Sequence, residues 1–369
     1  MIAALSEWRD RVLGRGDAAC TVPVLDGALK PNQVLEAAAP VHLAEAARDL
    51  VSDGHRLWLA DGPSVIELAP QHDGEVQARE LLRCDAPVTA LCALPDAQGG
   101  GLAVAVGGRE LRLVGGRQGG RAWKEADGRP FVAVNAIAAS DDGLIVSDGS
   151  AENGPDDWQR DLMTLGRSGR VVRLDPATGK AQVLAEHLHH AFGVAAHGSA
   201  VWVSESWRHR VVALGAGDRP SPVLDHLPGY PSRLTPAARG GWWLTVFACR
   251  TQLVEFVLRE PAFRSRMIAA MPPELWIAPQ LRPAQSFLEP LQSGGVKQMG
   301  VLKPWAPPRS YGLVIRLDAA GRPTGSLHSR VGGRHHGIVA AVECADALYV
   351  LSRGAGCVLR LELAGLEIE

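Results

Sequence analysis

The sequence has little of the features that would place it in a specialised class of protein. Its formal net charge of −2 leaves no excess of Lys and Arg, so neither nucleic acid nor an anionic membrane surface is expected as its main partner. No window approaches the roughly 18 to 20 consecutive apolar residues that a membrane-spanning helix needs. With 46% hydrophobic and 21% charged residues in 369, the composition is that of a folded globular chain. An enzyme or a binding protein acting on a small molecule is expected.

Two further signals are missing. The first segment, MIAALSEWRDRVLGRGD, carries Glu7, Arg9, Asp10 and Arg11, whereas an export signal needs an uninterrupted apolar core. This segment is interpreted as a short amphipathic helix. The six cysteines show neither CxxC nor zinc-type spacing, and without an export signal they are expected to be reduced thiols. A cytoplasmic location is therefore predicted.

What the sequence does contain is a repeated pattern of strands. A strand that ends in a small or polar residue recurs six times, as LWLADG at Leu57, GLAVAVGG at Gly101, GLIVSDGS at Gly143, AVWVSES at Ala200, GWWLTVF at Gly241 and ALYVLSR at Ala347. One weakly polar strand precedes each copy, and one or two further strands follow it. Four strands per unit, recurring roughly every 40 to 60 residues, are typical of the blades of a β-propeller.

The last unit is one strand short, because the chain ends on CVLRLEL. The segment NQVLEAA, from Asn32, is predicted to supply the missing strand and so to close the ring, which removes an exposed edge. We therefore predict an all-β, six-bladed propeller over residues 32–369, preceded by a leader with a helix over residues 1–31. A seven-bladed ring is the main alternative.

Two insertions interrupt the repeat, at about residues 151–168 and 249–310. Both join the second strand of a unit to its third, so both should overhang the same mouth of the central channel. The second insertion has helical spacing in Leu253, Phe256 and Val257 and again from Met267, with breaks at Pro261 and Pro272. These helices are expected to cap the rim, and the same arrangement can serve as a lid over a small-molecule pocket.

Several ordered motifs resemble one known family. GRVVRLDPATG at Gly169, LPGYP at Leu227, and SLHSRVGG at Ser326 leading into AVECADALYVLS resemble the strictosidine synthase-like propellers, which include the adipocyte plasma-membrane-associated protein and neighbour the gluconolactonase and paraoxonase group. The resemblance runs from about Pro23 to the C-terminus. It implies a six-bladed propeller with a small-molecule site at one mouth of the channel.

The resemblance also implies a calcium site that this sequence does not reproduce. Lactonases and arylesterases of the wider group hold calcium with a Glu on the first blade, Asn on the third and fourth, and Asp on the fifth. The matching positions here are Val41, Asn135, Phe192 and Ser232, with Arg233 beside the last. Neutral oxygens next to a guanidinium suit a divalent cation poorly, so no calcium and no other cofactor is expected.

Strictosidine synthase activity is not expected either. The Glu that the enzyme itself uses, on the first strand of the last blade, falls around Val339 and Ala340.

Histidines are the best catalytic candidates that remain. His189 and His190 precede AFGV, and His335 and His336 precede GIVA, which places each pair at the entrance to the first strand of a blade. Imidazole suits proton transfer near neutral pH, and several converging imidazoles could instead hold a transition metal. The alternative is that they are loop residues bonded to backbone carbonyls.

Other residues near the same mouth are candidates for substrate binding. They are Asn135, Tyr230, Ser232, Arg233, Phe192, Trp207 and Asp148. Asp148 could instead form hydrogen bonds with backbone amides in the turns between strands. The aromatic residues could instead pack within the blades.

The sequence therefore supports three hypotheses on function. The first is a hydrolase of lactones or esters with an altered, non-calcium site, in which Arg233, Asn135 and the His pairs activate water and polarise the carbonyl. The second is a propeller that binds a small molecule or a protein without chemistry. The third is a divergent enzyme of specialised metabolism.

Overall fold

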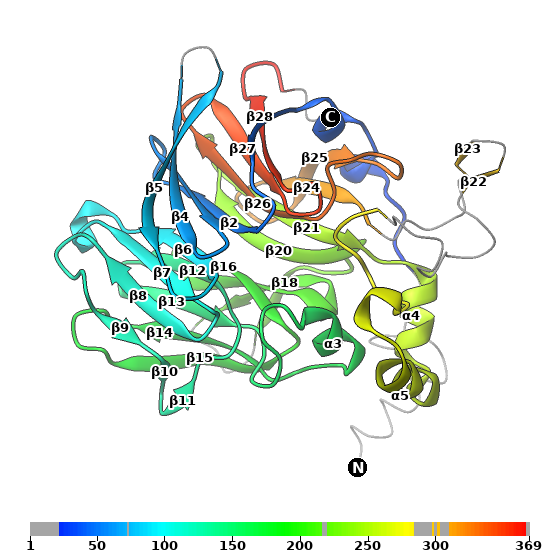
Figure 1. The fold of residues 1–369 in the computed structure, drawn as a ribbon, viewed down its shortest axis with the longest axis horizontal. Coiled ribbons are helices and arrows are strands. Elements are labelled where there is room, and N and C mark those ends of the chain that lie inside the picture. Colours follow the sequence, from blue (N-terminus) through cyan, green and yellow to red (C-terminus); the bar gives the residue numbers. More distant parts are fainter. Residues whose placement is uncertain are drawn as a thin grey trace.

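The fold is described here from a computed structural model, which describes residues 22–71, 74–215, 220–283, 297–298, 301–302 and 310–366. Six four-stranded antiparallel sheets are arranged as blades around a central channel (Figure 1). The six-bladed prediction is confirmed, and the seven-bladed alternative is wrong for the described part of the chain. The expected N-terminal helix lies outside the described residues, as does part of the second insertion.

Each blade contains four strands, which follow chain order from the channel outward in blades 1 to 5. The first three blades run as follows. Blade 1 consists of β2 (Ala47–Ser52), β3 (Leu57–Asp61), β4 (Ser64–Pro70) and β5 (Val76–Arg83). Blade 2 consists of β6 (Val88–Ala93), β7 (Leu102–Val106), β8 (Glu110–Val114) and β9 (Ala122–Trp123). Blade 3 consists of β12 (Val134–Ser140), β13 (Gly143–Asp148), β14 (Gly169–Leu174) and β15 (Ala181–Leu188).

The other three blades complete the ring. Blade 4 consists of β16 (Ala191–His197), β17 (Ala200–Glu205), β18 (Arg210–Leu214) and β19 (Ser221–Leu224). Blade 5 consists of β20 (Gly229–Pro236), β21 (Trp242–Cys249), β24 (Gly312–Leu317) and β25 (Pro323–Ser329). Blade 6 consists of β26 (Ile338–Cys344), β27 (Ala347–Ser352), β28 (Cys357–Glu362) and the N-terminal β1 (Ala39–Leu43).

Closure by an N-terminal strand is confirmed, but the predicted segment is wrong. The closing strand is β1, which pairs antiparallel with β28, whereas the predicted segment from Asn32 contains the short helix α2 (Val34–Ala37). The Asn32 side chain accepts a hydrogen bond from the Val34 amide, and Leu35 is fully buried. Leu, Glu and Ala favour a helix, so the strand begins only at the following APVHL.

The core lies between the faces of adjacent blades. Between blades 3 and 4, for example, one cluster combines Ile145 and Val171 with Val194, Val203 and Val212. Side chains alternate across each strand, and both faces of an inner blade strand are covered by neighbouring blades. The recurring apolar strands of the sequence therefore became the buried second and third strands.

Hydroxyl groups also connect blades 3, 4 and 5 to the blade that follows each of them. Ser147, Ser204 and Thr245 occupy matching places on the second strands of blades 3, 4 and 5, and each donates to a carbonyl on the first strand of the following blade, at Phe192, Ser232 and Val339 respectively.

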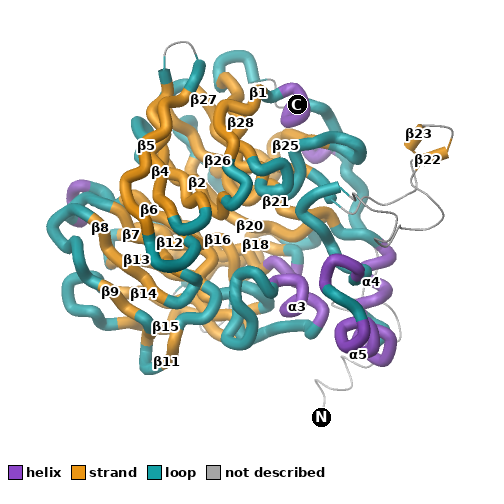
Figure 2. The backbone as a smooth tube through the Cα atoms, in the orientation of Figure 1, coloured by secondary structure: helices purple, strands orange, loops and turns teal. Residues whose placement is uncertain are grey.

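Helices lie mainly at one side of the ring of strands (Figure 2). The first insertion contains α3 (Trp158–Met163), and the second contains α4 (Gln252–Leu258) and α5 (Pro261–Ala270). The short turns η2 (Gly27–Leu29), η3 (Asp96–Gln98), η4 (Ser206–Arg208) and η5 (Pro273–Leu275) are 3₁₀ helices. Two-residue strands form the small sheets β10–β11 (Glu125–Ala126, Arg129–Pro130) and β22–β23 (Lys297–Gln298, Val301–Leu302). The predicted helical insertion is confirmed.

The close approach of blades 4 and 5 gives a stability prediction. A Cβ added at Gly193 would lie 2.3 Å from the Ser232 carbonyl oxygen, whereas one added at Gly154 would meet nothing within 4 Å. Gly193→Ala should therefore lower the free energy of unfolding by about 1–3 kcal/mol, and Gly154→Ala should leave it nearly unchanged. Urea unfolding followed by fluorescence measures both, and equal midpoints would contradict the tight contact.

Candidate functional site

The site begins with a regular feature of the first strands of the blades. In each of them the pairing with the second strand shifts within its first residues, as between Ala47 and Asp49 in β2 or between Val134 and Ala136 in β12. A bulge of this kind redirects a side chain. The residues at or beside these shifts that line one cavity are Arg48, Thr89, Asn135, Phe192, Arg233 and Val339, one from each blade.

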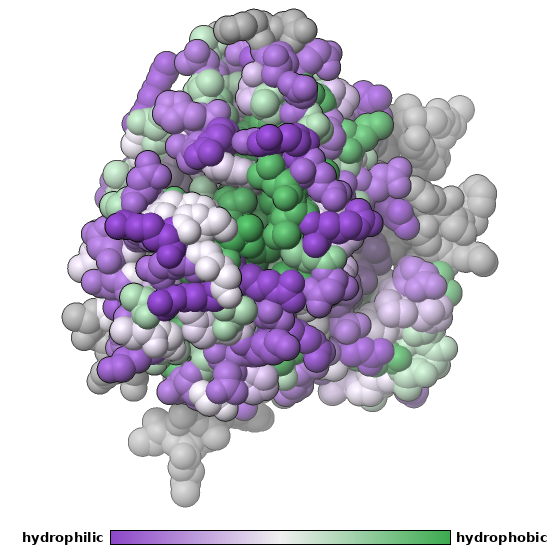
Figure 3. Space-filling model, turned by 60° about the vertical axis from the view of Figure 1, so that its left-hand side comes forward, coloured by the Kyte–Doolittle hydropathy of each residue, from purple (hydrophilic) through white to green (hydrophobic). Residues whose placement is uncertain are grey.

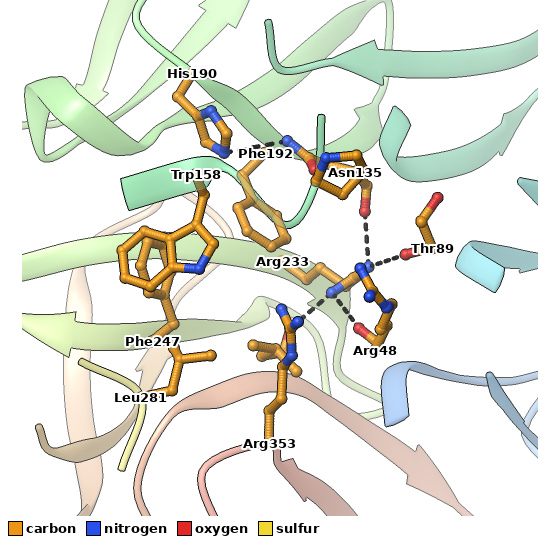
Figure 4. A pocket seen from close by; sticks show the side chains of 12 residues that line it. Arg48, Thr89, Asn135, Trp158, His190, Phe192, Arg233, Phe247, Leu281 and Arg353 are labelled. Atoms are coloured by element: carbon orange, nitrogen blue, oxygen red, sulfur yellow. Dashed lines mark hydrogen bonds between the residues drawn. The ribbon is translucent and has the colours of Figure 1, made fainter. Parts of the chain in front are cut away.

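Arg233 crosses the channel and joins the other blades. Its Nη1 donates to the carbonyls of Arg48 and Val339, at 3.2 Å each. Its Nη2 donates to the carbonyls of Thr89 at 3.1 Å and Asn135 at 2.7 Å (Figure 4). The guanidinium also lies 5.2 Å from the centre of the Phe192 ring. One side chain from blade 5 thus contacts all five other blades.

Asp49 balances the charge of Arg233. Its Oδ1 lies 2.8 Å from Arg233 Nε, and its two oxygens accept from the Leu50 and Leu91 amides. Burial raises the pKa of Asp49 to about 6, against the opposing effect of the Arg233 charge. The pair is therefore ionised at neutral pH, and the four Nη N–H groups of Arg233 all donate to carbonyls.

This arrangement does not suit the calcium site that the family resemblance implies. The Arg233 guanidinium already places a positive charge at the channel axis. Asn135 Nδ2 donates to the Ala191 carbonyl at 3.1 Å. Within the described ranges no three His, Cys, Asp or Glu side chains are placed to hold a metal ion. Calcium needs six or more oxygen ligands, usually with carboxylates, and the residues present do not offer them.

A second buried pair lies at the edge of the same cavity. His190 Nδ1 lies 3.4 Å from Asp161 Oδ2, and both residues are almost fully buried. Asp161 comes from α3 in the first insertion, and its oxygens also accept from Trp207 Nε1 at 2.7 Å and Asn153 Nδ2 at 3.0 Å. The His190 ring stacks on Trp207 with centroids 4.3 Å apart. The imidazole is therefore held in one orientation.

The hydrogen-bond network assigns the tautomer of His190. Its Nε2 lies 3.3 Å from Asn135 Nδ2, and an amide nitrogen only donates. Nε2 is therefore the acceptor, and the ring proton sits on Nδ1 toward Asp161. An Asp–His pair whose unprotonated ring nitrogen lies at a cavity is an arrangement that suits general-base catalysis.

Insertion residues cover the cavity. Pro155 and Trp158 come from the first insertion and Leu281 from the second, while Phe247 at the end of β21 completes an aromatic wall (Figure 4). The cavity volume is about 30 Å³, which holds one or two water molecules. A larger substrate would extend from this cavity past Trp158 and Leu281.

The structure separates the predicted histidines. His190 lines the cavity, but His336 bonds Ser310 Oγ and the Arg330 carbonyl through its two ring nitrogens. His335 bonds the Leu35 carbonyl. Burial lowers the pKa of His336, which keeps it neutral. His189 is half-buried, and its backbone amide donates to Glu205. The two pairs do not converge on one cavity.

The other predicted site residues divide in the same way. Asn135, Phe192 and Arg233 line the cavity. Tyr230 and Trp207 pack behind it, with ring centroids 5.8 Å apart.

Three predicted positions serve the architecture instead. Ser232 bonds Thr245 Oγ1 at 2.7 Å. Asp148 pairs with Arg170 and accepts from the Ala133 amide. Val41, matched by resemblance to a metal ligand of the first blade, lies on the outer strand of blade 6. The first-blade position at the cavity is Arg48.

Sequence reasoning missed four charged residues of the site: Arg48, Asp49, Asp161 and Arg353. A signal existed for two of them. Asp49 is a carboxylate inside the buried alternation of ARDLVS, and Arg353 ends the second strand of the last blade at ALYVLSR. Asp161 lies in an insertion, where no repeat indicates its position.

The opposite end of the channel holds a larger cavity, of about 690 Å³. Apolar side chains near the far ends of the first strands line it, among them Leu91, Ile137, Val194 and Val342. The molecular surface shows a hydrophobic hollow inside a polar rim on this face (Figure 3).

Comparisons with known proteins agree with this architecture. Strictosidine synthase-like protein 10 of Arabidopsis thaliana is 27% identical over 201 residues, covering 52% of this chain and 51% of that protein. The adipocyte plasma membrane-associated protein of Salmo salar is 28% identical over 227 residues, covering 58% and 46%. This chain is similar to the strictosidine synthase-like propellers. It spans about half the length of these curated relatives, and no family model matches it.

Solved structures show the fold of this chain. A gluconolactonase from Xanthomonas campestris superposes with a TM-score of 0.54 at 13% identity, covering 93% of this chain and 95% of that one. A luciferin-regenerating enzyme superposes with a TM-score of 0.51 at 13% identity, covering 91% and 95%. At such identities the likeness establishes the fold alone. No helix in the described part is long and apolar enough to cross a membrane.

The Arg233–Asp49 pair gives a prediction on stability. Arg233→Met leaves a buried carboxylate and four carbonyls without their donor, so it should destabilise the fold by about 3–5 kcal/mol. Arg233→Met combined with Asp49→Leu should recover part of the loss. Urea unfolding midpoints measure this, with the exposed Arg79→Met as the control. A single variant as stable as the parent would contradict the role of Arg233.

Asp161 gives a prediction on acid stability. Burial alone would raise the pKa of its carboxyl, but the hydrogen bond and charge of His190 and the bond from Trp207 lower it to about 2. A folded-state pKa below the unfolded one stabilises the protein above about pH 4, and this stabilisation is lost as the pH falls toward 2.

Asp161→Asn should therefore lower the urea midpoint at pH 7 and flatten its decline between pH 4 and 2. The exposed Asp157→Asn should keep the parental profile. Parallel profiles for the parent and Asp161→Asn would contradict the assigned interaction.

Proposed function

We propose that this strictosidine synthase-like propeller is a small-molecule hydrolase of esters or lactones with a metal-free site. The supporting observation is the buried Asp161–His190 pair, whose acceptor nitrogen Nε2 is held at the cavity on the insertion side. The relatives add support of a general kind, because one propeller of the same fold is described as a gluconolactonase.

In the proposed reaction His190 is the general base. Nε2 takes a proton from a water molecule as its oxygen attacks the substrate carbonyl carbon, and Asp161 stabilises the imidazolium that results. The tetrahedral intermediate then breaks its bond to the leaving oxygen, which receives the proton from Nε2. The products are a carboxylic acid and an alcohol, joined in one molecule when the substrate is a lactone.

Asn135 is placed to stabilise the oxyanion. In the resting site its Nδ2 donates toward His190 Nε2. Once Nε2 carries a proton it no longer accepts, so the Asn135 N–H is released toward the developing negative charge, where such donors act most strongly. Arg233 does not share this role, because its four Nη N–H groups donate to backbone carbonyls and its charge is paired with Asp49.

Binding without chemistry is the second candidate. The cavity volume of about 30 Å³ favours it, because a hydrolase must admit its substrate past Trp158 and Leu281. Turnover of any substrate in a panel of aryl esters and lactones separates the two candidates.

The catalytic prediction concerns His190. His190→Ala should lower kcat by about 10²–10⁴-fold, measured on aryl esters and lactones. His55→Ala, an exposed histidine on a turn of blade 1, should have no effect. His336→Ala should lower the unfolding midpoint without changing kcat of the folded enzyme. Unchanged kcat in His190→Ala would remove this residue from the mechanism. Stoichiometric calcium found by elemental analysis of the parent protein would overturn the metal-free site.

A further inference from the structure

Two further arginines face the same cavity as His190. Arg48 is on β2, and Arg353 follows β27 in blade 6, so they reach the cavity from neighbouring blades (Figure 4). Their side chains are 15% and 26% exposed. Neither takes part in the Arg233–Asp49 pair, and the proposed hydrolysis gives neither a role.

The positive charge around the cavity exceeds the negative charge. Asp49 forms an ion pair with Arg233, and Asp161 contacts His190 and Trp207. Among the described residues, Asp156 is the carboxylate paired with Arg48 and Arg353, and its side chain is 68% exposed. Two guanidinium groups therefore share one carboxylate, which is largely exposed to solvent.

The pKa of Arg353 agrees with this excess of positive charge. Burial lowers its pKa to about 10, and the nearby charges of Arg48 and Arg233 act in the same direction. Arg353 stays protonated at neutral pH, and a second anion beside it would be stabilising.

Asp156 shows what kind of group fits between the arginines. Arg48 Nη2 lies 2.7 Å from Asp156 Oδ1 and 2.9 Å from Oδ2, and Arg353 Nη2 lies 3.6 Å from the same Oδ1. One nitrogen of Arg48 thus donates to both oxygens of a carboxylate, and Arg353 lies at ion-pair distance from one of them. Charged donors of this kind bind carboxylates strongly.

We propose that Arg48 and Arg353 recognise a carboxylate group of the substrate, so that the substrate is an ester or lactone that also carries a carboxylate. The inference rests on the proposed function, because it assigns a substrate class to the same site. Asp156 occupies the anion position while the site is empty of ligand. The aromatic side chains of Trp158, Phe192 and Phe247 then face the apolar part of the substrate.

Binding can be tested without turnover. Acetate is the probe, acetamide its neutral isostere, and inorganic phosphate a tetrahedral anion, each titrated by calorimetry. Acetate should bind and acetamide should not, and Arg48→Gln and Arg353→Gln should each weaken acetate at least tenfold. The exposed Arg79→Gln should have no effect. Equal binding of acetate and acetamide, or phosphate binding as tightly as acetate, would overturn the carboxylate assignment.

One variant separates recognition from a structural role. Asp156→Asn removes the contact between the first insertion and the two arginines but leaves both guanidinium groups in place. If the arginines recognise an anion, this variant should bind acetate more tightly than the parent. If they only fasten the insertion, Asp156→Asn should weaken acetate as the arginine variants do, which would overturn the proposal. Urea midpoints establish that each variant is folded.

Kinetics distinguish failure of this inference from failure of the proposed function. The mono-4-nitrophenyl ester of succinic acid and 4-nitrophenyl butyrate differ by a terminal carboxylate. The first should have the lower KM in the parent, and Arg353→Gln should abolish the difference. Hydrolysis of both esters with equal KM would overturn the substrate class alone. If neither is hydrolysed, the hydrolase proposal loses its support, while acetate binding that persists in His190→Ala keeps the carboxylate site.

Discussion

The ion pair between Arg233 and Asp49 is the interaction on which the channel depends. A ring of blades leaves backbone carbonyls facing its axis, and buried carbonyls need donors. Arg233 supplies them to four blades from a fifth, and Asp49 supplies the compensating charge. A planar, permanently charged group with five N–H donors suits this place, where lysine would satisfy fewer acceptors. The described residues around Arg233 therefore do not offer the set of oxygen ligands that a calcium ion needs.

The chemistry at the mouth follows from the same geometry. Because Arg233 is fully engaged, proton transfer and anion recognition depend on side chains around it. His190 is positioned by Asp161 and Trp207, one contributed by the first insertion and one by η4. Arg48 and Arg353 are joined to the insertion through Asp156. The first insertion thus both covers the cavity and supplies the partner of the proposed base. A movement of the insertion that opens the cavity would therefore also move Asp161 relative to His190.

The sequence predicted the repeat better than the site. Six copies of an apolar strand that ends in a small or polar residue are sufficient to count blades, because each blade must bury the same kind of strand. The segment from Asn32 was misplaced because a short helix and a strand have similar apolar content. His190 could be found from its position before AFGV, but His336 has the same position in another blade, and only its two hydrogen bonds show that it supports the fold. Asp49 and Arg233 are far apart in the chain, so their pairing could not be predicted.

The bonds of Arg233 also divide the space inside the ring. The cavity of about 30 Å³ lies on one side of this residue, and the apolar cavity of about 690 Å³ begins beyond it, at Leu234 and Thr235. A molecule could pass between them only by breaking the guanidinium contacts to four blades. The two ends of the channel are therefore separate compartments, and a compound that fills the wide end would leave the narrow end chemically unchanged.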